Sequence, residues 1–417
     1  MNEVKRRTET DAGDERSEEP NESPVIVVVG IGADGMAGLG ESSRIELRSA
    51  TVIYGSPRQL DLLDDSVTAP QRRWPSPMLP TLEHLLDDDP TGDIHVVASG
   101  DPLLHGIGAT LIRLYGPDQV RVLPHVSSAT LACARMGWAV HDTEVVSLVN
   151  APVHTAVRRG GRAVVLSRDA ATPAALAAAL TGTGRGASEF TVLEQIGGPA
   201  ERIRSGPADI WAAAPPADID DLNIIAVRYQ PDEHDGLSLP DAAFSHDGQI
   251  TKQTIRAVTL AALSPRPGEL LWDVGSGSGS VAVQWCRSAP GCRAVAFETD
   301  PQRRERIAAN AIAFGVDVQV RGEAPDDFAG APQPDVIFIG GGLTRTGLVE
   351  ECFGHLPGGG RLVANAVTAE SEALLVQWHS RLAGELRRFQ HYRGEPLGGF
   401  TGWRPQMPIT QWSVKLL

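Results

Sequence analysis

The sequence predicts an α/β protein of two domains, each built from strands and helices that alternate along the chain. Its 417 residues suit two domains, because a domain usually takes about 100–200 residues. Strand-like and helix-like segments alternate from residue 25 to near the end of the chain. A glycine-rich loop follows the first strand-like segment of each half.

The composition narrows the class of protein. Hydrophobic residues make up 42% of the chain, which is enough for a sizeable core. The 52 acidic and 37 basic residues give a net charge of −15, which argues against a nucleic-acid partner, since such proteins present a basic face. No apolar run reaches the roughly 20 residues of a membrane span, and the amino terminus resembles no signal peptide. The four cysteines have no zinc-like spacing. We therefore expect a cytoplasmic protein with no membrane partner and no bound metal.

The chain opens with a polar segment and then a strongly apolar strand. Residues 1–23 are highly charged and lack hydrophobic periodicity, which predicts a disordered tail. Val25–Gly30 is apolar at successive positions, so a strand there would be covered on both faces. This predicts a central strand of a parallel sheet.

Alternation continues through the first half to about Val227. The further predicted strands are Val52–Tyr54, Ile94–Ala98, Val120–Leu123, Ala163–Leu166, Thr191–Glu194 and Asn223–Val227, and the predicted helices include Gly106–Tyr115, Ser128–Met136 and Pro173–Leu180. The polar segment Gln230–Gly236 then predicts a boundary, with a first domain over residues 24–235 and a second over 236–417.

The second half repeats the same kind of alternation. Its predicted strands are Leu270–Val274, Ala294–Glu298, Val318–Arg321, Val336–Ile339 and Arg361–Ala364, and its predicted helices are Lys252–Leu263, Val281–Arg287, Arg303–Phe314 and Ser371–Leu382.

The most informative motif lies after the first strand of the second half. Asp273 is followed by the loop Gly275-Ser276-Gly277-Ser278-Gly279 and then by a helix. Glycines let the backbone approach a ligand closely, and the helix N-terminus offers unpaired N–H groups. The loop has no lysine of a nucleotide-hydrolysing loop, and GxGxG differs from the dinucleotide pattern GxGxxG. It resembles the first motif of the seven-strand S-adenosylmethionine (SAM)-dependent methyltransferases.

That resemblance implies a SAM site built from further strand ends. Glu298 ends the next strand, 25 positions after Asp273, where a carboxylate can accept both hydroxyls of a ribose. Glu323 and Ala324 follow the third strand and are expected to flank the adenine. Thr251 lies in another family-like segment, Gln249–Lys252, and is included in the predicted cofactor site.

The first half carries three loop motifs at strand ends. Gly30, Gly32 and Gly35 follow the first strand, Gly100-Asp101 follows another, and Ser127-Ser128 precedes a helix. Alone, the glycines would also suit a tight turn or a dinucleotide site, and the serines could simply cap the helix. Together the motifs resemble the tetrapyrrole methylase family, in which two α/β lobes hold SAM between them. The resemblance implies a second SAM site with these residues and with Thr172, which opens a later helix.

A two-lobe tetrapyrrole methylase fold followed by a Rossmann-like SAM methyltransferase fold resembles one family in particular. This is the fused, decarboxylating precorrin-6Y C5,15-methyltransferase family of cobalamin biosynthesis, and the resemblance covers about residues 25–417. It implies methylation of precorrin-6B at C5 by the first domain and at C15 by the second. The second domain would also remove CO2 from the C12 acetate, and the product would be precorrin-8X.

Other functions stay open on the sequence alone. The acceptor could be a cobalt-precorrin or another tetrapyrrole, since the motifs report only the cofactor. An NAD(P)-dependent oxidoreductase is disfavoured by the GxGxG spacing, and a SAM-binding regulatory module is disfavoured by intact glycine loops in both halves.

A polycarboxylate acceptor requires a locally basic cleft in this acidic chain. Arg345 and Asn365 are the predicted substrate-binding residues, and the arginines near the carboxyl end (Arg387, Arg388, Arg393 and Arg404) are further candidates. We expect an Arg345→Ala variant to lose turnover and to retain SAM affinity. No catalytic acid or base can be assigned. Because isolated relatives of both halves commonly self-associate, a homo-oligomer is expected.

Overall fold

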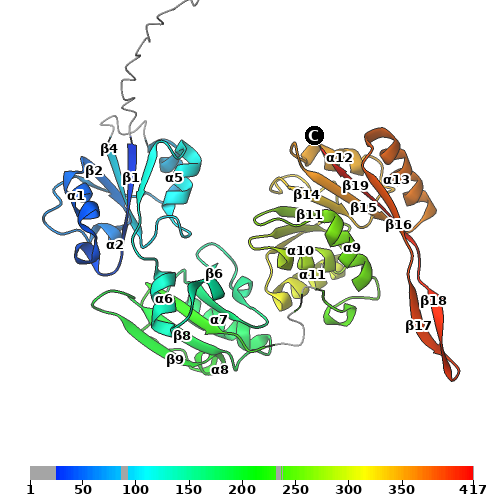
Figure 1. Ribbon diagram of the computed structural model, residues 1–417, viewed down its shortest axis with the longest axis horizontal. Helices are drawn as coiled ribbons and strands as arrows, with labels where there is room; N and C mark the ends of the chain where they lie inside the picture. Colours follow the sequence, from blue (N-terminus) through cyan, green and yellow to red (C-terminus); the bar gives the residue numbers. More distant parts are fainter. Residues whose placement is uncertain (1–24, 86–92, 232–235, 237, 417) are drawn as a thin grey trace, which may run out of the picture. The chain divides into compact units, whose positions relative to one another are not determined.

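A computed structural model of the protein describes residues 25–85, 93–231, 236 and 238–416 (Figure 1). The predicted tail, residues 1–23, lies outside the described residues. By its internal packing the chain divides into two units, Met1–Leu131 with Gly197–Pro199, and Ala132–Ile196 with Ala200–Leu417. This division falls between the two lobes that the first-half resemblance predicts.

The first unit contains a five-stranded parallel sheet with the strand order β3-β2-β4-β1-β5. The strands are β1 (Val25–Ile31), β2 (Val52–Gly55), β3 (Gln71–Arg73), β4 (Asp93–Ser99) and β5 (Val120–Leu123). The helices are α1 (Glu41–Ser49), α2 (Pro57–Leu60), α3 (Leu79–Glu83) and α5 (Ile107–Tyr115), with the short 3-10 turn η1 (Gly35–Gly38).

Strand β1 is an interior strand of this sheet, between β4 and β5, and it is covered on both faces, as predicted. Ile26 and Val28 belong to one hydrophobic cluster, and Val27 and Val29 belong to another. Successive side chains of a strand point to opposite faces, so each face of β1 is buried in its own cluster.

The second unit begins with a mixed sheet of order β6-β7-β10-β8-β9. Strands β6 and β7 are parallel, and the remaining pairs are antiparallel. The strands are β6 (Glu144–Ser147), β7 (Arg162–Leu166), β8 (Glu189–Glu194), β9 (Arg202–Pro207) and β10 (Asn223–Arg228). The helices are α6 (Ser128–Met136), which begins in the first unit, α7 (Thr172–Gly182) and α8 (Ala208–Ala213), with the 3-10 turns η2 (Val140–Asp142) and η3 (Val153–Ala156).

The C-terminal part of the second unit contains a seven-stranded sheet of order β13-β12-β11-β14-β15-β19-β16. Strands β11 (Leu270–Val274), β12 (Arg293–Phe297), β13 (Val318–Arg321), β14 (Val336–Ile339) and β15 (Arg361–Ala366) are parallel, whereas β19 (Ile409–Lys415) is antiparallel to β15 and to β16 (Glu385–Phe389). The helices are α9 (Gln253–Leu263), α10 (Ser280–Ser288), α11 (Pro301–Phe314), α12 (Leu348–His355) and α13 (Ala369–Leu382), and the 3-10 turn η4 (Asp241–Ala243) precedes them. Every strand and helix predicted for this half is present, and β16 to β19 are additional.

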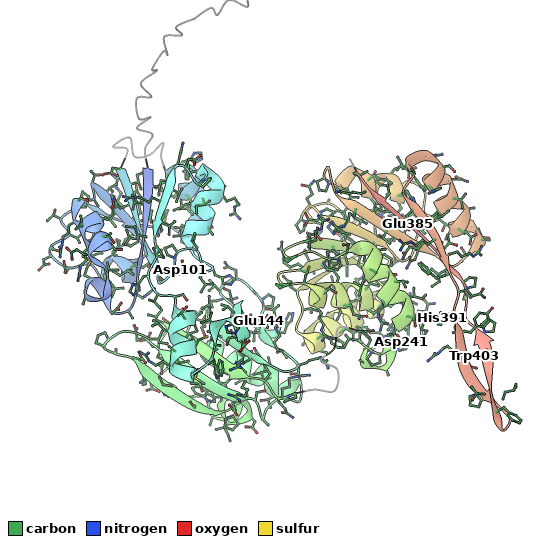
Figure 2. The ribbon with its side chains drawn as sticks, viewed as in Figure 1. Asp101, Glu144, Asp241, Glu385, His391 and Trp403 are labelled. Atoms are coloured by element: carbon green, nitrogen blue, oxygen red, sulfur yellow. The ribbon has the colours of Figure 1, made fainter. Side chains whose placement is uncertain are left out.

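Two of the additional strands form a ribbon outside the main sheet. β17 (Tyr392–Leu397) and β18 (Phe400–Pro405) pair only with each other, and Figure 1 shows them extending away from the C-terminal sheet. The side chain of Trp403, labelled in Figure 2, is 76% exposed, and that of Phe400 is 83% exposed. Within the described part of the chain, no helix is long and apolar enough to cross a membrane.

Candidate active sites

The glycine loop of the C-terminal sheet lies against the loop after β14. Gly275 has a φ of +70°, and a Cβ at this position would lie 2.7 Å from backbone atoms of Gly341. Gly277 and Gly279 also have positive φ values, and Gly279 precedes α10. The turn and the close approach therefore both require glycine.

Asp273 holds this loop from inside the sheet. It is 1% exposed, and its Oδ2 accepts hydrogen bonds from the Ser276 hydroxyl at 2.8 Å and from the Ala282 N–H at 3.1 Å. Burial raises the pKa of Asp273 to about 6, the two hydrogen bonds oppose that shift, and the negative charge of Glu298 adds to it. Its Oδ1 is buried with no hydrogen-bond partner among the described residues. A buried, unpaired carboxylate oxygen fits a ligand that brings a cation or a donor.

Glu298 is placed as the sequence predicts, directly after β12. Its Oε2 accepts from the Gly277 N–H at 2.8 Å and its Oε1 from the Asp300 N–H at 3.0 Å, and the residue is 7% exposed. Each carboxylate oxygen can accept a further hydrogen bond. The loop backbone thus orients a carboxylate that retains acceptor capacity for a pair of hydroxyls.

Arg345, from the loop after β14, holds the loop after β13. Its guanidinium donates to the Ala324 carbonyl at 2.8 Å and to Asp326 Oδ2 at 2.8 Å, and it also pairs with Glu323. Through these contacts Arg345 positions Glu323 and Ala324, the two residues expected beside the adenine. Arg345 therefore positions the loop after β13, and its predicted contact with the substrate stays a prediction.

Replacing Arg345 by alanine is therefore expected to weaken SAM binding in the C-terminal half, contrary to the retained affinity expected from the sequence. Losing hydrogen bonds between charged groups should cost about tenfold in affinity. Calorimetric titration with SAM measures the change. Arg228→Ala, which removes an exposed ion pair with Glu189, is the control and should bind SAM normally. Unchanged SAM affinity in Arg345→Ala would contradict the positioning role.

Two other predicted residues of this half are held by the protein itself. The Asn365 amide donates to the Thr259 hydroxyl at 2.9 Å and accepts from the Gln411 amide at 2.9 Å. The carbonyl of Thr251 accepts from Arg256, whose side chain is fully buried. Asn365 therefore lies in a largely buried polar network, and Thr251 is fixed through its backbone.

In the first unit, the loops after β1, β4 and β5 meet at one edge of the sheet. A Cβ at Gly30 would lie 2.0 Å from the Gly100 carbonyl oxygen and 2.7 Å from the His125 nitrogen. The N–H of Gly100, which has a φ of +55°, donates to the Ile31 carbonyl at 2.9 Å. Gly35 also has a positive φ, of +61°. The predicted glycines are thus brought together.

The predicted hydroxyl and carboxylate residues of the first half bond within their own turns. Ser127 Oγ accepts from the Thr130 N–H at 3.0 Å, which is a helix cap, and Ser128 is the first residue of α6. Asp101 Oδ1 accepts from the Leu103 N–H at 2.9 Å. Thr172 belongs to the other unit, where its hydroxyl donates to Asp169 Oδ1 at 3.0 Å.

The structure adds two residues that the sequence reasoning left out of this site. His125 Nε2 lies 3.5 Å from Asp34 Oδ1, and a Cβ at Gly32 would lie within 3 Å of both side chains. Asp34 Oδ1 is buried with no hydrogen-bond partner among the described residues. The signal that could have identified Asp34 is the presence of an acidic residue two positions after Gly32.

Each glycine loop follows the first strand of its α/β sheet, and beside each lies a buried carboxylate oxygen that accepts no hydrogen bond from the described residues. Together with the family models, these features define a two-domain methyltransferase. Residues 25–210 match the model of tetrapyrrole (corrin/porphyrin) methylases, and residues 242–416 match that of a precorrin methyltransferase domain. The fold class expected from the sequence is confirmed.

Curated relatives identify the family. The chain is 69% identical over 390 residues to a precorrin-6Y C(5,15)-methyltransferase (decarboxylating) of Mycobacterium tuberculosis, covering 94% of this chain and 99% of the relative. A protein of the same name from Sinorhizobium sp is 43% identical, covering 94% of this chain and 96% of the relative. The cobalt-precorrin-6B C(15)-methyltransferase (decarboxylating) of Salmonella typhimurium is 33% identical over 173 residues, covering 38% of this chain and 85% of the relative. The chain belongs to the family of decarboxylating precorrin-6Y C(5,15)-methyltransferases, as its motifs predict.

Proposed function

We propose that the protein methylates precorrin-6B at C5 and C15 with SAM and removes CO2 from the C12 acetate, giving precorrin-8X in cytoplasmic cobalamin biosynthesis. The observation that carries the proposal is a glycine-loop site in each of the two methyltransferase folds. Identity of 69% to a relative named for both positions supports the same pair of reactions here.

We assign C5 methylation to residues 24–235, and C15 methylation with decarboxylation to residues 236–417. The Salmonella relative supports placing the last two reactions in one domain. Its name contains both C(15) methylation and decarboxylation, and it aligns over only 173 residues, about the length of one of the two domains.

SAM, when bound, supplies an electrophilic methyl group in each domain. The residues that would hold it in the first domain are Gly30, Gly32, Gly35, Gly100, Asp101, Ser127, Ser128 and Thr172. In the second domain they are Thr251, Asp273, Gly275, Ser276, Gly277, Ser278, Gly279, Glu298, Glu323 and Ala324.

The chain's own task is to align the acceptor carbon with the methyl group and to exclude water. The conjugated ring itself can accept the electron pair that the departing CO2 leaves behind. The acetate carbon that loses CO2 must then take up a proton to become a methyl group. Alignment and exclusion of water matter more for these reactions than a strong acid or base from the protein.

Titration of the purified protein with SAM and with NAD tests the cofactor. We expect two SAM sites and no NAD binding, and NAD binding would overturn the proposal. Incubation with precorrin-6B and SAM should then add two methyl groups and remove one CO2, as measured by mass spectrometry. A parallel incubation with cobalt-precorrin-6B distinguishes the metal-free from the cobalt-containing acceptor.

We also propose that the β17–β18 ribbon joins two copies of the chain. The strand register places Tyr392, Trp403 and two prolines, Pro396 and Pro405, on one uncharged face of the ribbon. Arg393, Glu395 and Arg404 lie on the other face. A two-stranded hairpin alone is marginally stable in water. Tyr and Trp bury about 150–250 Å² each, so four such rings from two copies approach the roughly 1,000 Å² of a specific interface.

A Trp403→Ser variant is expected to dissociate into protomers, because packing the two uncharged faces together depends on this ring. Sedimentation velocity measures the oligomeric state. Ile312→Ser, which changes an exposed apolar side chain on α11, is the control and should leave the state unchanged. A monomeric wild type, or a Trp403→Ser variant that remains associated, would contradict the proposal.

A further inference from the structure

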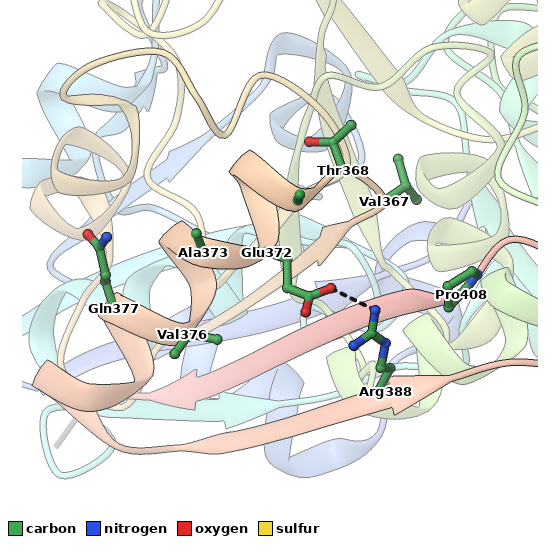
Figure 3. A pocket seen from close by; sticks show the side chains of 9 residues that line it. Val367, Thr368, Glu372, Ala373, Val376, Gln377, Arg388 and Pro408 are labelled. Atoms are coloured by element: carbon green, nitrogen blue, oxygen red, sulfur yellow. Dashed lines mark ion pairs between the residues drawn. The ribbon is translucent and has the colours of Figure 1, made fainter.

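A second site lies on the C-terminal sheet, apart from the glycine loop. A cavity of about 530 Å³ opens where β15 ends, between the first turns of α13 and the strands β16 and β19 (Figure 3). Its volume lies in the range of small-molecule pockets, about 300–1,000 Å³. None of the residues predicted to bind SAM lines it.

The cavity shares an edge of the sheet with the cofactor loop. β11, β14 and β15 are parallel neighbours, so their carboxyl ends lie at the same edge. The loop Gly275–Gly279 follows β11, and Val367 in the cavity wall follows β15. Neighbouring strands are about 4.8 Å apart, so the ends of β11 and β15 are separated by about 10 Å. β16, which carries Arg388, is two strands beyond β15 and therefore about 19 Å from β11. A large ring can therefore reach from one site to the other.

The walls combine apolar side chains with polar ones and with one pair of opposite charges. Val367, Ala373, Val376 and Pro408 line the cavity, and Arg388 of β16 is the cationic residue among its described lining. Thr368, Gln377 and the carboxylate of Glu372 also line the cavity. The apolar residues can contact the edge of a ring, and the guanidinium is the group that can bind one of the ring's carboxylate side chains.

Glu372 holds Arg388 in this position. Its Oε2 lies 3.2 Å from Arg388 Nη2 and accepts from the Thr410 hydroxyl at 3.0 Å, and Figure 3 shows the ion pair at the cavity. A guanidinium has five N–H donors, so one ion pair leaves Arg388 able to bind a second carboxylate. The Arg388 side chain is 60% exposed, so an incoming anion can reach it.

The other candidate arginines are placed differently. Arg387 is adjacent in β16, so its side chain points to the opposite face, and it pairs with Glu385. Arg345 is bound to the loop after β13, and Arg404 pairs with Glu395 on the ribbon. Arg388 is the candidate that lines the cavity.

We infer that this cavity is the acceptor subsite of the C-terminal domain and that Arg388 binds a carboxylate of the macrocycle there. The inference deepens the proposed function and rests on it. It also gives this acidic chain, of net charge −15, a defined cation for a polyanionic substrate.

The matched pair Arg388→Gln and Arg387→Gln tests the inference. Both changes remove one exposed arginine from the same strand, but only the first alters the cavity. Arg388→Gln should raise the KM for precorrin in C15 methylation by about tenfold, because it loses a hydrogen bond between charged groups. SAM affinity and melting temperature should stay at the wild-type values, and Arg387→Gln should match the wild type in all three measurements.

A third variant separates carboxylate binding from a structural role. Glu372→Gln removes the neighbouring negative charge, but the amide oxygen can still accept from Arg388 and Thr410 and so keep Arg388 in place. It should therefore leave precorrin binding as tight as in the wild type or tighter. If Glu372→Gln and Arg388→Gln weaken precorrin binding equally, or if Arg388→Gln behaves like Arg387→Gln, the inference is overturned. If the wild type methylates no precorrin, the proposed function itself fails, so the two failures are distinguishable.

Discussion

Alanine in place of Gly275 is expected to abolish SAM binding by the C-terminal domain and to leave the N-terminal site intact. Its φ of +70° disfavours alanine by about 1–2 kcal/mol, and the new Cβ would lie 2.7 Å from the Gly341 backbone. Because the nearest atoms, the Cα and N of Gly341, belong to the backbone, the collision can be relieved only if the loop itself moves. A displacement of about 1 Å at a reacting site can cost roughly a hundredfold in rate.

Calorimetry should count one SAM site in Gly275→Ala instead of two, and product analysis should find no methyl group at C15 and no loss of CO2. Gly330→Ala is the matched control, since Gly330 has nearly the same φ, +71°, but no atom within 4 Å of the added Cβ. Gly330→Ala therefore introduces the strain of a positive φ without a collision of the added Cβ. Two intact SAM sites in Gly275→Ala would show that the loop is not a cofactor site.

Alanine in place of Gly30 should have the reciprocal effect on the N-terminal domain. The added Cβ would lie 2.0 Å from the Gly100 carbonyl oxygen, which no real Cβ contact approaches, and 2.7 Å from the His125 nitrogen. The loops after β1, β4 and β5 would have to separate, at a cost of about 1–3 kcal/mol or more. We expect the SAM site of this domain to be lost with its C5 methylation.

The measurement is again the number of SAM sites, together with the absence of a methyl group at C5. Gly40→Ala is the control, because a Cβ at Gly40 meets no atom within 4 Å. Loss of C15 methylation instead of C5 methylation would reverse the assignment of the two reactions to the two domains.

The parallel parts of both folds could be predicted because their signal is local. A run such as Val25–Gly30 or Leu270–Gly275 encodes a strand covered on both faces and the turn that ends it. The carboxylate of Glu298 follows from the same reasoning, because it stands where the next parallel strand ends.

The antiparallel end of the C-terminal sheet carried no such signal. β16, β17 and β18 are mostly exposed and mix charged, aromatic and glycine residues, so no period-2 pattern identifies them. β16 pairs with β19, and β17 and β18 pair with each other, so these strands depend on pairing that no local pattern encodes.

By itself, the sequence determined the family, the fold class and the glycines and carboxylates of the cofactor loops, because each depends on residues close together in the chain. Only the tertiary structure decided which charges meet. Arg345 lies against Glu323, and Arg388 lies against Glu372. The partners in each pair come from different strand ends or helices, so strand order, which no local pattern encodes, determines where each charge can act.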